Sequence, residues 1–294
     1  SVAAAKRGVK VRVILDQSPD RFRKGETHNQ QIAGYLKANG VEVLTYPPNH
    51  VNIDHVKLLI ADDNKALIGG MNWGAHSPDN KDADVLIKGN EAAELKRDIF
   101  NKDVKYAGGK PDNTVVGPVK DDNIKVLTTS PKDEEGGAHA IRETLLSDIN
   151  GARKNIYAEM FTLTDSEVVN SLITAHNRGV DVKVILDPNQ HSTNQKSYDA
   201  LKAAGVPVKW YNVNASTKQK LHAKWGVFDD NKTLLGSANW TAQGLSTAKN
   251  NRANHEADVE VNDKAANAVF TKTFAADWNN SSDNLPQGLP GPSF

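Results

Sequence analysis

The stretch HVKLLIADDNKALIGGMN, from His55 to Asn72, decides the fold because it sets polar groups on an apolar, strand-forming spine. His55 and Lys57 are two residues apart, so on an extended chain their side chains point to the same face. A turn at DDNK leads to a second apolar run, ALIGG, whose glycines allow close approach of a ligand near Asn72. One such unit offers an imidazole, a fixed cation and an amide donor.

The same pattern returns in HAKWGVFDDNKTLLGSAN, from His222 to Asn239. The agreement extends to the flanking blocks. RGVKVRVILD (Arg7 to Asp16) returns as RGVDVKVILD (Arg178 to Asp187), and LKANGVEVLTY (Leu36 to Tyr46) returns as LKAAGVPVKWY (Leu201 to Tyr211). Three blocks in one order indicate two copies of one fold.

Helical and strand patterns alternate within each copy. VKVRVILD and VDVKVILD have the β-branched character of buried strands, whereas DSEVVNSLITAHNRG (Asp165 to Gly179) has apolar residues at helical spacing. We predict an α/β fold of two fused repeats, each a mostly parallel mixed sheet flanked by helices, related by a pseudo-twofold axis with the active site between them. The first repeat covers residues 1–120, and the second covers 121–294 with a C-terminal tail.

The two repeats differ in completeness. The second has a predicted helix, a strand and most of another helix before NRGV, whereas only SVAAAK precedes RGV in the first. A sheet that lacks an inner strand exposes its edges, so we expect the native chain to begin before Ser1.

Composition excludes several kinds of site. The 36 basic and 36 acidic residues balance, so no overall positive field attracts nucleic acid or anionic lipid. Cysteine is absent, which excludes thiol catalysis, disulfides and thiolate metal sites. No apolar run has the length of a membrane span.

Two facing copies would place two imidazoles, two ammonium groups and two amides around one cavity. This set suits a phosphodiester, because cations and amides hold the nonbridging oxygens while one neutral histidine attacks phosphorus. The other histidine, protonated, gives its proton to the leaving oxygen. The scheme requires no metal and no other cofactor.

The repeated H-x-K-x4-D pattern, followed by GGMN and GSAN, resembles the HKD motif of the phospholipase D superfamily, and bacterial phospholipase D most of all. The resemblance implies a phosphohistidine intermediate that water or an alcohol resolves. It implies that His55 is the nucleophile and His222 the general acid and then base, although the symmetry of the motifs leaves this order open. Phosphate binding falls to Lys57, Lys224, Asn72 and Asn239. The motif aspartates Asp62 and Asp229 complete the catalytic set, and we assign them to the architecture of the site more than to proton transfer.

The resemblance also implies an acid that orients each histidine. NKDADVLI and NHEADVEV align, which makes Asp82 and Glu256 the expected partners. Asp84 and Asp258 lie two residues further along the same strand face and remain alternatives.

Flanking residues have two interpretations each. Trp73 and Trp240 either line the pocket or pack in the core. Asp16 and Asp187 end strands and are favoured as structural residues, while His50 and His76 lie near the first motif and are either substrate contacts or ordinary loop residues.

The expected activity is hydrolysis of phosphatidylcholine to phosphatidic acid and choline, with transfer of the phosphatidyl group to alcohols. The substrate would be a phospholipid at a membrane or micelle surface, and the enzyme a secreted or periplasmic monomer. One alternative is an HKD endonuclease that cleaves DNA or RNA, because the chemistry requires only a phosphodiester. A second alternative is a catalytically inactive scaffold that binds anions. The polar loops weigh against a lipid enzyme, and the neutral composition weighs against a nuclease.

Overall fold

The computed structural model describes residues 1–17, 29–46, 53–75, 77–118, 123–131, 138–246 and 253–289. His50 and His76 lie outside the described residues, so their two interpretations stay predictions. No helix in the described ranges has both the length and the apolar character needed to cross a membrane.

The elements of the first repeat alternate as the sequence pattern predicts. In chain order they are α1 (Val2–Lys6), β1 (Arg12–Leu15), α2 (Gln30–Ala38), β2 (Glu42–Thr45), β3 (Leu58–Ala61), β4 (Lys65–Gly69), the 3-10 turn η1 (Ser77–Asp79), β5 (Asp84–Lys88), α3 (Asn90–Leu95), the π-helical turn η2 (Lys96–Phe100) and α4 (Asn101–Tyr106).

The second repeat contains additional elements before its first block. In chain order its elements are β6 (Ile124–Thr129), α5 (Ala140–Gly151), β7 (Asn155–Met160), α6 (Ser166–Asn177), β8 (Asp181–Leu186), η3 (Pro188–Gln190), α7 (His191–Ala203), β9 (Val208–Tyr211), η4 (Ala215–Thr217), β10 (Lys224–Phe228), β11 (Lys232–Gly236), α8 (Ala242–Leu245), β12 (Glu256–Val261), α9 (Lys264–Asn279) and β13 (Ser281–Ser282).

The second repeat forms a mixed sheet with the strand order β13-β9-β8-β7-β10-β11-β12-β6. This confirms the predicted α/β class. Only β7 with β8 and β8 with β9 pair in parallel, while the other neighbours are antiparallel. The prediction of a mostly parallel sheet was therefore wrong, because most neighbouring strands are antiparallel. The cause is that β10 and β11 follow one another through a tight turn, where a parallel pair would need a crossover helix.

The first repeat forms two separate sheets among the described residues. β1 pairs with β2 in parallel, and β3, β4 and β5 form an antiparallel sheet. In the second repeat the corresponding strands β8 and β10 are joined because β7 lies between them. The described part of the first repeat has no strand equivalent to β7, and this difference explains the separation.

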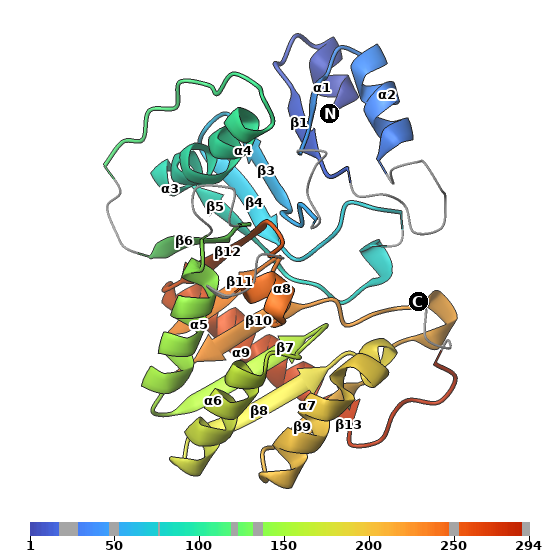
Figure 1. The fold of residues 1–294 in the computed structure, drawn as a ribbon, viewed down its shortest axis with the longest axis vertical. Helices are drawn as coiled ribbons and strands as arrows, with labels where there is room; N and C mark the ends of the chain where they lie inside the picture. Colours follow the sequence, from blue (N-terminus) through green and yellow to red (C-terminus); the bar gives the residue numbers. More distant parts are fainter. Residues whose placement is uncertain are drawn as a thin grey trace.

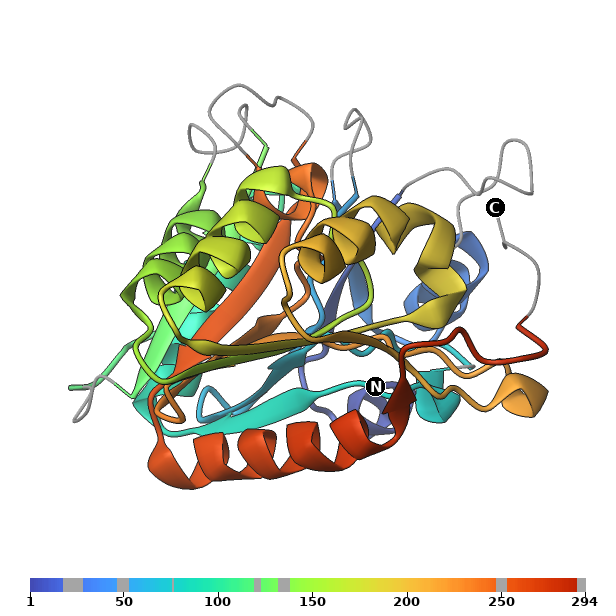
Figure 2. The same ribbon diagram turned by 90° about the horizontal axis from the view of Figure 1, so that it is seen from below.

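Helices cover both faces of the large sheet (Figures 1 and 2). In Figure 2, α5, α6 and α7 lie over one face, and α9 lies over the opposite face. One hydrophobic cluster fills the space under α5 to α7. A second cluster joins the repeats, because Ile68 and Leu95 of the first repeat pack with Trp225, Val259 and Phe270 of the second.

Two short backbone bridges also connect the repeats, and they occupy equivalent positions. The N–H of His55 donates to the carbonyl of His255 at 2.8 Å, and the N–H of His222 donates to the carbonyl of Lys81 at 2.7 Å. Each motif histidine is thereby fixed beside the segment that precedes an acid of the other repeat. This crossed arrangement is the local form of the pseudo-twofold relationship.

Candidate active site

The motif lysines fold back toward their own histidines. Lys57 lies just before β3 and Lys224 begins β10, and each ammonium donates to the carbonyl of the histidine two residues earlier. Lys224 is only 2% exposed and His222 only 7%. The alternation predicted from the sequence therefore produces two buried lysines, and Nζ of Lys224 lies 3.2 Å from Nδ1 and 3.3 Å from Nε2 of His222.

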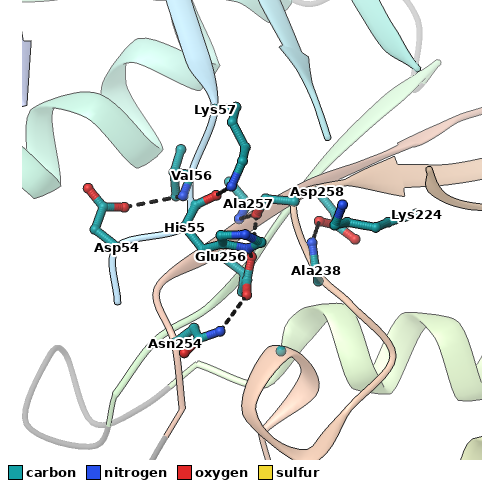
Figure 3. A network of polar contacts seen from close by, with 12 residues as sticks. Asp54, His55, Val56, Lys57, Lys224, Ala238, Asn254, Glu256, Ala257 and Asp258 are labelled. Carbon is teal, nitrogen blue, oxygen red and sulfur yellow. Dashed lines mark hydrogen bonds and ion pairs between the residues drawn. The ribbon is translucent and has the colours of Figure 1, made fainter. Parts of the chain in front are cut away.

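Each motif histidine is hydrogen-bonded to an acid from the other repeat. The Nδ1 atom of His55 lies 2.9 Å from Oε2 of Glu256, and Nδ1 of His222 lies 2.7 Å from Oδ2 of Asp82. Figure 3 shows the ring of His55 against Glu256, with Asn254 on the other side of the carboxylate. Because the carboxylate engages Nδ1, the Nε2 atom is the one that can react, and at His222 it lies 3.3 Å from Nζ of Lys224.

The alternative acids, Asp84 and Asp258, accept hydrogen bonds from backbone N–H groups. Asp84 Oδ1 accepts the N–H of Met71 at 3.2 Å, and Asp258 Oδ1 accepts the N–H of Ala238 at 3.1 Å. A Cβ at Gly236 would lie 2.1 Å from Oδ1 of Asp258, so glycine is required where this carboxylate crosses. The structure thus places Asp82 and Glu256 at the histidines and uses the alternative acids to hold the turns beyond β4 and β11.

Glu256 has a more elaborate set of partners than Asp82. Ser237 Oγ donates to Oε2 of Glu256 at 2.6 Å, and Asn254 Nδ2 donates to Oε1 at 2.9 Å. Burial raises the pKa of Glu256, but His55, Lys57 and Ser237 outweigh burial and lower it below its usual value. Sequence reasoning missed Ser237 and Asn254. The difference between GG in the first motif and GS in the second was the available signal.

The electrostatics of the site favour an incoming anion. Burial lowers the pKa of Lys57 to about 7 and that of Lys224 to about 8. Burial and the nearby Lys224 lower the pKa of His222 to about 4, and burial also lowers that of His55 against the opposing effect of Glu256. A phosphodiester carries a negative charge, so its binding would raise all four pKa values and favour the protonated forms.

The motif aspartates lie away from the histidines. Asp62 and Asp229 occupy the hairpin turns in the left-handed region, with φ of 52° and 54°. Asp229 is five residues beyond Lys224, which corresponds to roughly 17 Å along an extended strand. This position agrees with assigning these aspartates to structure more than to proton transfer.

The carboxylate of Asp229 supports the fold instead. Its Oδ1 accepts the backbone N–H groups of Arg153, Lys154 and Asn155 at 3.0, 2.7 and 3.2 Å. The described first repeat has no segment equivalent to 153–155, and Asp62 is exposed. Asp229 therefore fixes the backbone before β7, at a distance from the histidines, and the expected role in the architecture of the site stays a prediction.

Asp16 and Asp187 have equivalent structural positions. Asp187 Oδ2 accepts the N–H of Leu221 at 2.6 Å, and Asp16 Oδ1 accepts the N–H of Asp54 at 2.8 Å. In each case the donor immediately precedes a motif histidine. These strand-ending aspartates hold the backbone from which the histidines project.

The Asn-Trp pairs that end the two motifs differ in how far they are buried. Asn72 and Trp73 are exposed, whereas Asn239 is half-buried and Trp240 is only 1% exposed. Trp240 packs in the core and bridges to Leu163 in the segment after β7, which the described first repeat lacks. Core packing is therefore the role of Trp240, and Trp73 is an apolar surface residue next to the site.

Comparison with known proteins identifies the family. Residues 2–104 and 145–278 match the family described as "Cardiolipin synthase, PLD-like domain". The chain belongs to this family of the phospholipase D superfamily.

Two curated relatives of this phospholipase D-like chain carry lipid enzyme names. Mitochondrial cardiolipin hydrolase of Chlamydomonas reinhardtii is 28% identical over 133 residues, 45% of this chain and 55% of that protein. Cardiolipin synthase A of Pectobacterium carotovorum subsp. carotovorum (strain PC1) is 26% identical over 271 residues, 83% of this chain and 54% of that protein. The chain thus spans about half the length of these curated relatives.

The phospholipase D-like fold is also seen in a solved structure. The crystal structure of phosphatidylserine synthase from Haemophilus influenzae Rd KW20 superposes with a TM-score of 0.70 at 11% identity, covering 94% of this chain and 75% of that one. At this identity the likeness concerns the fold alone. The chain accordingly has the fold of the phospholipase D superfamily.

Proposed function

We propose that this protein transfers the phosphatidyl group of anionic diacyl phospholipids, of the phosphatidylglycerol and cardiolipin kind, to water or to an alcohol. The observation that supports the proposal is the crossed arrangement of the two histidine–acid pairs around two buried lysines. A phosphodiester between them meets a nucleophile, a proton donor and two cations, which are the groups that its displacement requires.

The first step forms the covalent intermediate. The Nε2 lone pair of His55 attacks phosphorus, and the bond from phosphorus to the leaving oxygen breaks. The leaving oxygen takes the proton from Nε2 of His222. Glu256 stabilises the positive charge that develops on the His55 ring, because it is ionised and bonded to Nδ1.

The second step reverses these roles. His222, now neutral, removes a proton from water or an alcohol, whose oxygen attacks phosphorus while the bond to His55 breaks. The pKa of about 4 for His222 belongs to the site without an anion. A bound phosphodiester raises that pKa, so substrate binding itself favours the protonated acid that the first step needs.

The surface next to the site supports a lipid substrate. Trp73 is 58% exposed beside Asn72, and Ile53 is 36% exposed two residues before His55. Exposed apolar side chains at a polar site suit insertion into the outer part of a lipid layer. Two exposed apolar side chains near the motif residues therefore offset the polar loops that weighed against a lipid enzyme in the sequence.

The head group in this proposal differs from the phosphatidylcholine expected from the sequence. The named relatives are cardiolipin synthases and hydrolases, which favours phosphodiesters whose head group is itself a glycerol derivative. Phosphatidylcholine remains an arm of the test, as does nucleic acid.

The test offers the purified protein separate vesicles of phosphatidylglycerol, cardiolipin and phosphatidylcholine containing ethanol, with single- and double-stranded DNA and RNA in parallel, all in EDTA. Phosphatidylethanol formed from the anionic vesicles, and absent with His55→Ala and His222→Ala, is the expected result. Product from phosphatidylcholine alone would refute the anionic head group and support the choline head group expected from the sequence. Cleaved nucleic acid with intact lipid would refute the lipid substrate.

A further inference from the structure

The residue before each histidine-binding acid is a basic side chain in an ion pair. Lys81 precedes Asp82, and its Nζ lies 3.0 Å from Oδ2 of Asp277. His255 precedes Glu256, and its Nε2 lies 2.9 Å from Oδ1 of Asp103. Both contacts lie within salt-bridge distance, and that of His255 is an ion pair when its ring is protonated.

The two pairs are related by the pseudo-twofold axis. Asp103 lies on α4, at the end of the helical segment that follows β5, and Asp277 lies on α9, which follows β12. Asp103 is 22 residues after Lys81 (103 − 81), and Asp277 is 22 residues after His255 (277 − 255), so the positions are equivalent. Each basic residue nevertheless pairs with the helix of the other repeat, in the same sense as the adjacent acid pairs with the histidine of the other repeat.

We propose that these ion pairs are two crossed clamps that position Asp82 and Glu256 against the reacting histidines. Lys81 with Asp277 would hold Asp82 at His222, and His255 with Asp103 would hold Glu256 at His55. The four residues are positioning residues, since they act through the acids. The inference rests on the proposed function for its catalytic meaning.

The first clamp is buried at its acidic end. Asp277 is buried, and the neighbouring Glu159 of β7 is fully buried. Burial and the neighbouring Asp277 raise the pKa of Glu159 well above its usual value. Partial burial lowers the pKa of Lys81, but Asp277 outweighs it and raises that pKa overall. Removal of Lys81 would leave the buried Asp277 without this cation, so the contact restrains the segment that carries Asp82.

The second clamp is enclosed on several sides. The ring of Tyr46 stacks on that of His255 at 5.1 Å and 13°. Asp54 lies nearby, and burial raises its pKa to about 7, with His255 lowering and Asp103 raising it. The ring of His255 therefore contacts an aromatic face and the carboxyl group of Asp103, both from the first repeat. Its place is fixed by contacts that do not involve Glu256.

Proton spectra of protein with ring-15N histidine test the clamps without turnover. A histidine Nδ1–H bonded to a carboxylate gives a low-field proton signal, which His55→Ala and His222→Ala assign. Lys81→Met removes a positive charge next to Asp82, and by charge alone this would strengthen the acceptor and move the His222 signal to lower field. Loss of the clamp has the opposite effect, a shift to higher field or broadening by exchange.

With Lys81→Met we expect the His222 signal to move to higher field or broaden while the His55 signal is retained. Asp103→Asn, which is isosteric, should change the His55 signal and leave the His222 signal as it is. Lys81→Arg, which keeps the positive charge, should leave the His222 signal at its normal position. Asp283→Asn, in the exposed pair with Lys202, is the control for removal of a carboxylate. An unchanged or low-field-shifted His222 signal in Lys81→Met would overturn the proposal.

Asp277→Asn gives a second route if Lys81→Met does not fold. It too should affect the His222 signal selectively, and equal effects on both histidines would contradict a clamp. Under the proposed function, kcat should fall roughly tenfold in each clamp variant with KM little changed. Altered spectra in a protein without phosphodiesterase activity would retain the clamps and refute the function.

Discussion

The carboxylate of Glu256 lies 2.9 Å from the imidazole of His55, although the two residues are separated by most of the chain and belong to different repeats. The reciprocal contact joins Asp82 to His222 at 2.7 Å. Neither repeat therefore holds a complete histidine–acid pair of its own. The site exists only at the junction, which couples catalysis to the packing of the two repeats.

Neutralising either acid should impair the histidine of the opposite repeat. Glu256→Gln and Asp82→Asn keep shape but remove the charge that stabilises the ring cation, so kcat should fall roughly 100-fold or more. Steady-state kinetics on a soluble phosphodiester measures this effect, with Asp283→Asn as the control. Activity near that of the unmodified protein in both variants would remove the acids from the mechanism.

The buried His222 should make the protein less stable in mild acid. Its pKa is lowered from 6.5 to about 4 in the folded state, so the unfolded chain binds the proton more readily. Stability from this group is fully present above pH 6.5 and is lost as the pH falls toward 4, by about 3 kcal/mol in all.

Urea unfolding at about pH 7.5 and about pH 4.5 measures this loss, and His222→Gln should reduce the difference between the two pH values. Saturating inorganic phosphate should also reduce it, because the anion raises the folded-state pKa. An identical pH dependence in His222→Gln would show that other groups control it.

EDTA should not slow turnover, because the proposed chemistry uses only the two histidines and two lysines. Rates measured after extensive dialysis against the chelator provide the test. Loss of activity that one particular divalent cation restores would contradict the mechanism.

The motif aspartates should differ in their effect on stability. Asp229→Ala removes the acceptor of three backbone N–H groups and places alanine at a φ of 54°, so it should cost about 3 kcal/mol. Asp62→Ala should cost only about 1 kcal/mol, because Asp62 is exposed and chiefly the backbone strain remains. Denaturant titration compares the two variants, and similar values would refute the assigned difference.

The paired tryptophans should separate lipid contact from folding. Trp73→Ala should lower activity on vesicles but leave activity on a soluble phosphodiester and the Tm unchanged, since Trp73 is exposed. Trp240→Ala should destabilise the fold by about 3 to 5 kcal/mol, because Trp240 is in the core. Equal loss of both activities in Trp73→Ala would argue against an interfacial role.

The sequence was sufficient to predict the two-repeat α/β fold, because His, Lys and Asn recur with matched flanking strands. It could not show that Asp82 serves His222, since aligned repeats look the same whether their contacts lie within a repeat or between repeats. Nor could it show which acid of each D-x-D or E-x-D pair meets the histidine, because both side chains share one strand face.

Other differences depend on packing that only the three-dimensional structure reveals. Trp73 and Trp240 have equivalent sequence positions, yet only Trp240 is covered, by the segment around Leu163. The antiparallel share of the sheet was underestimated, because the strand pattern of β10 does not reveal the direction of its neighbour β7.

The central claim is that His55 carries the transferred group and His222 moves the proton. A phosphodiester with a 4-nitrophenol leaving group tests it most directly, because this leaving group needs no proton. In His222→Ala, rapid mixing should give a stoichiometric burst of 4-nitrophenol, and mass spectrometry of peptides from the quenched protein should place the adduct on His55. An adduct on His222 in His55→Ala, with none on His55 in the reciprocal variant, would reverse the roles and contradict the account.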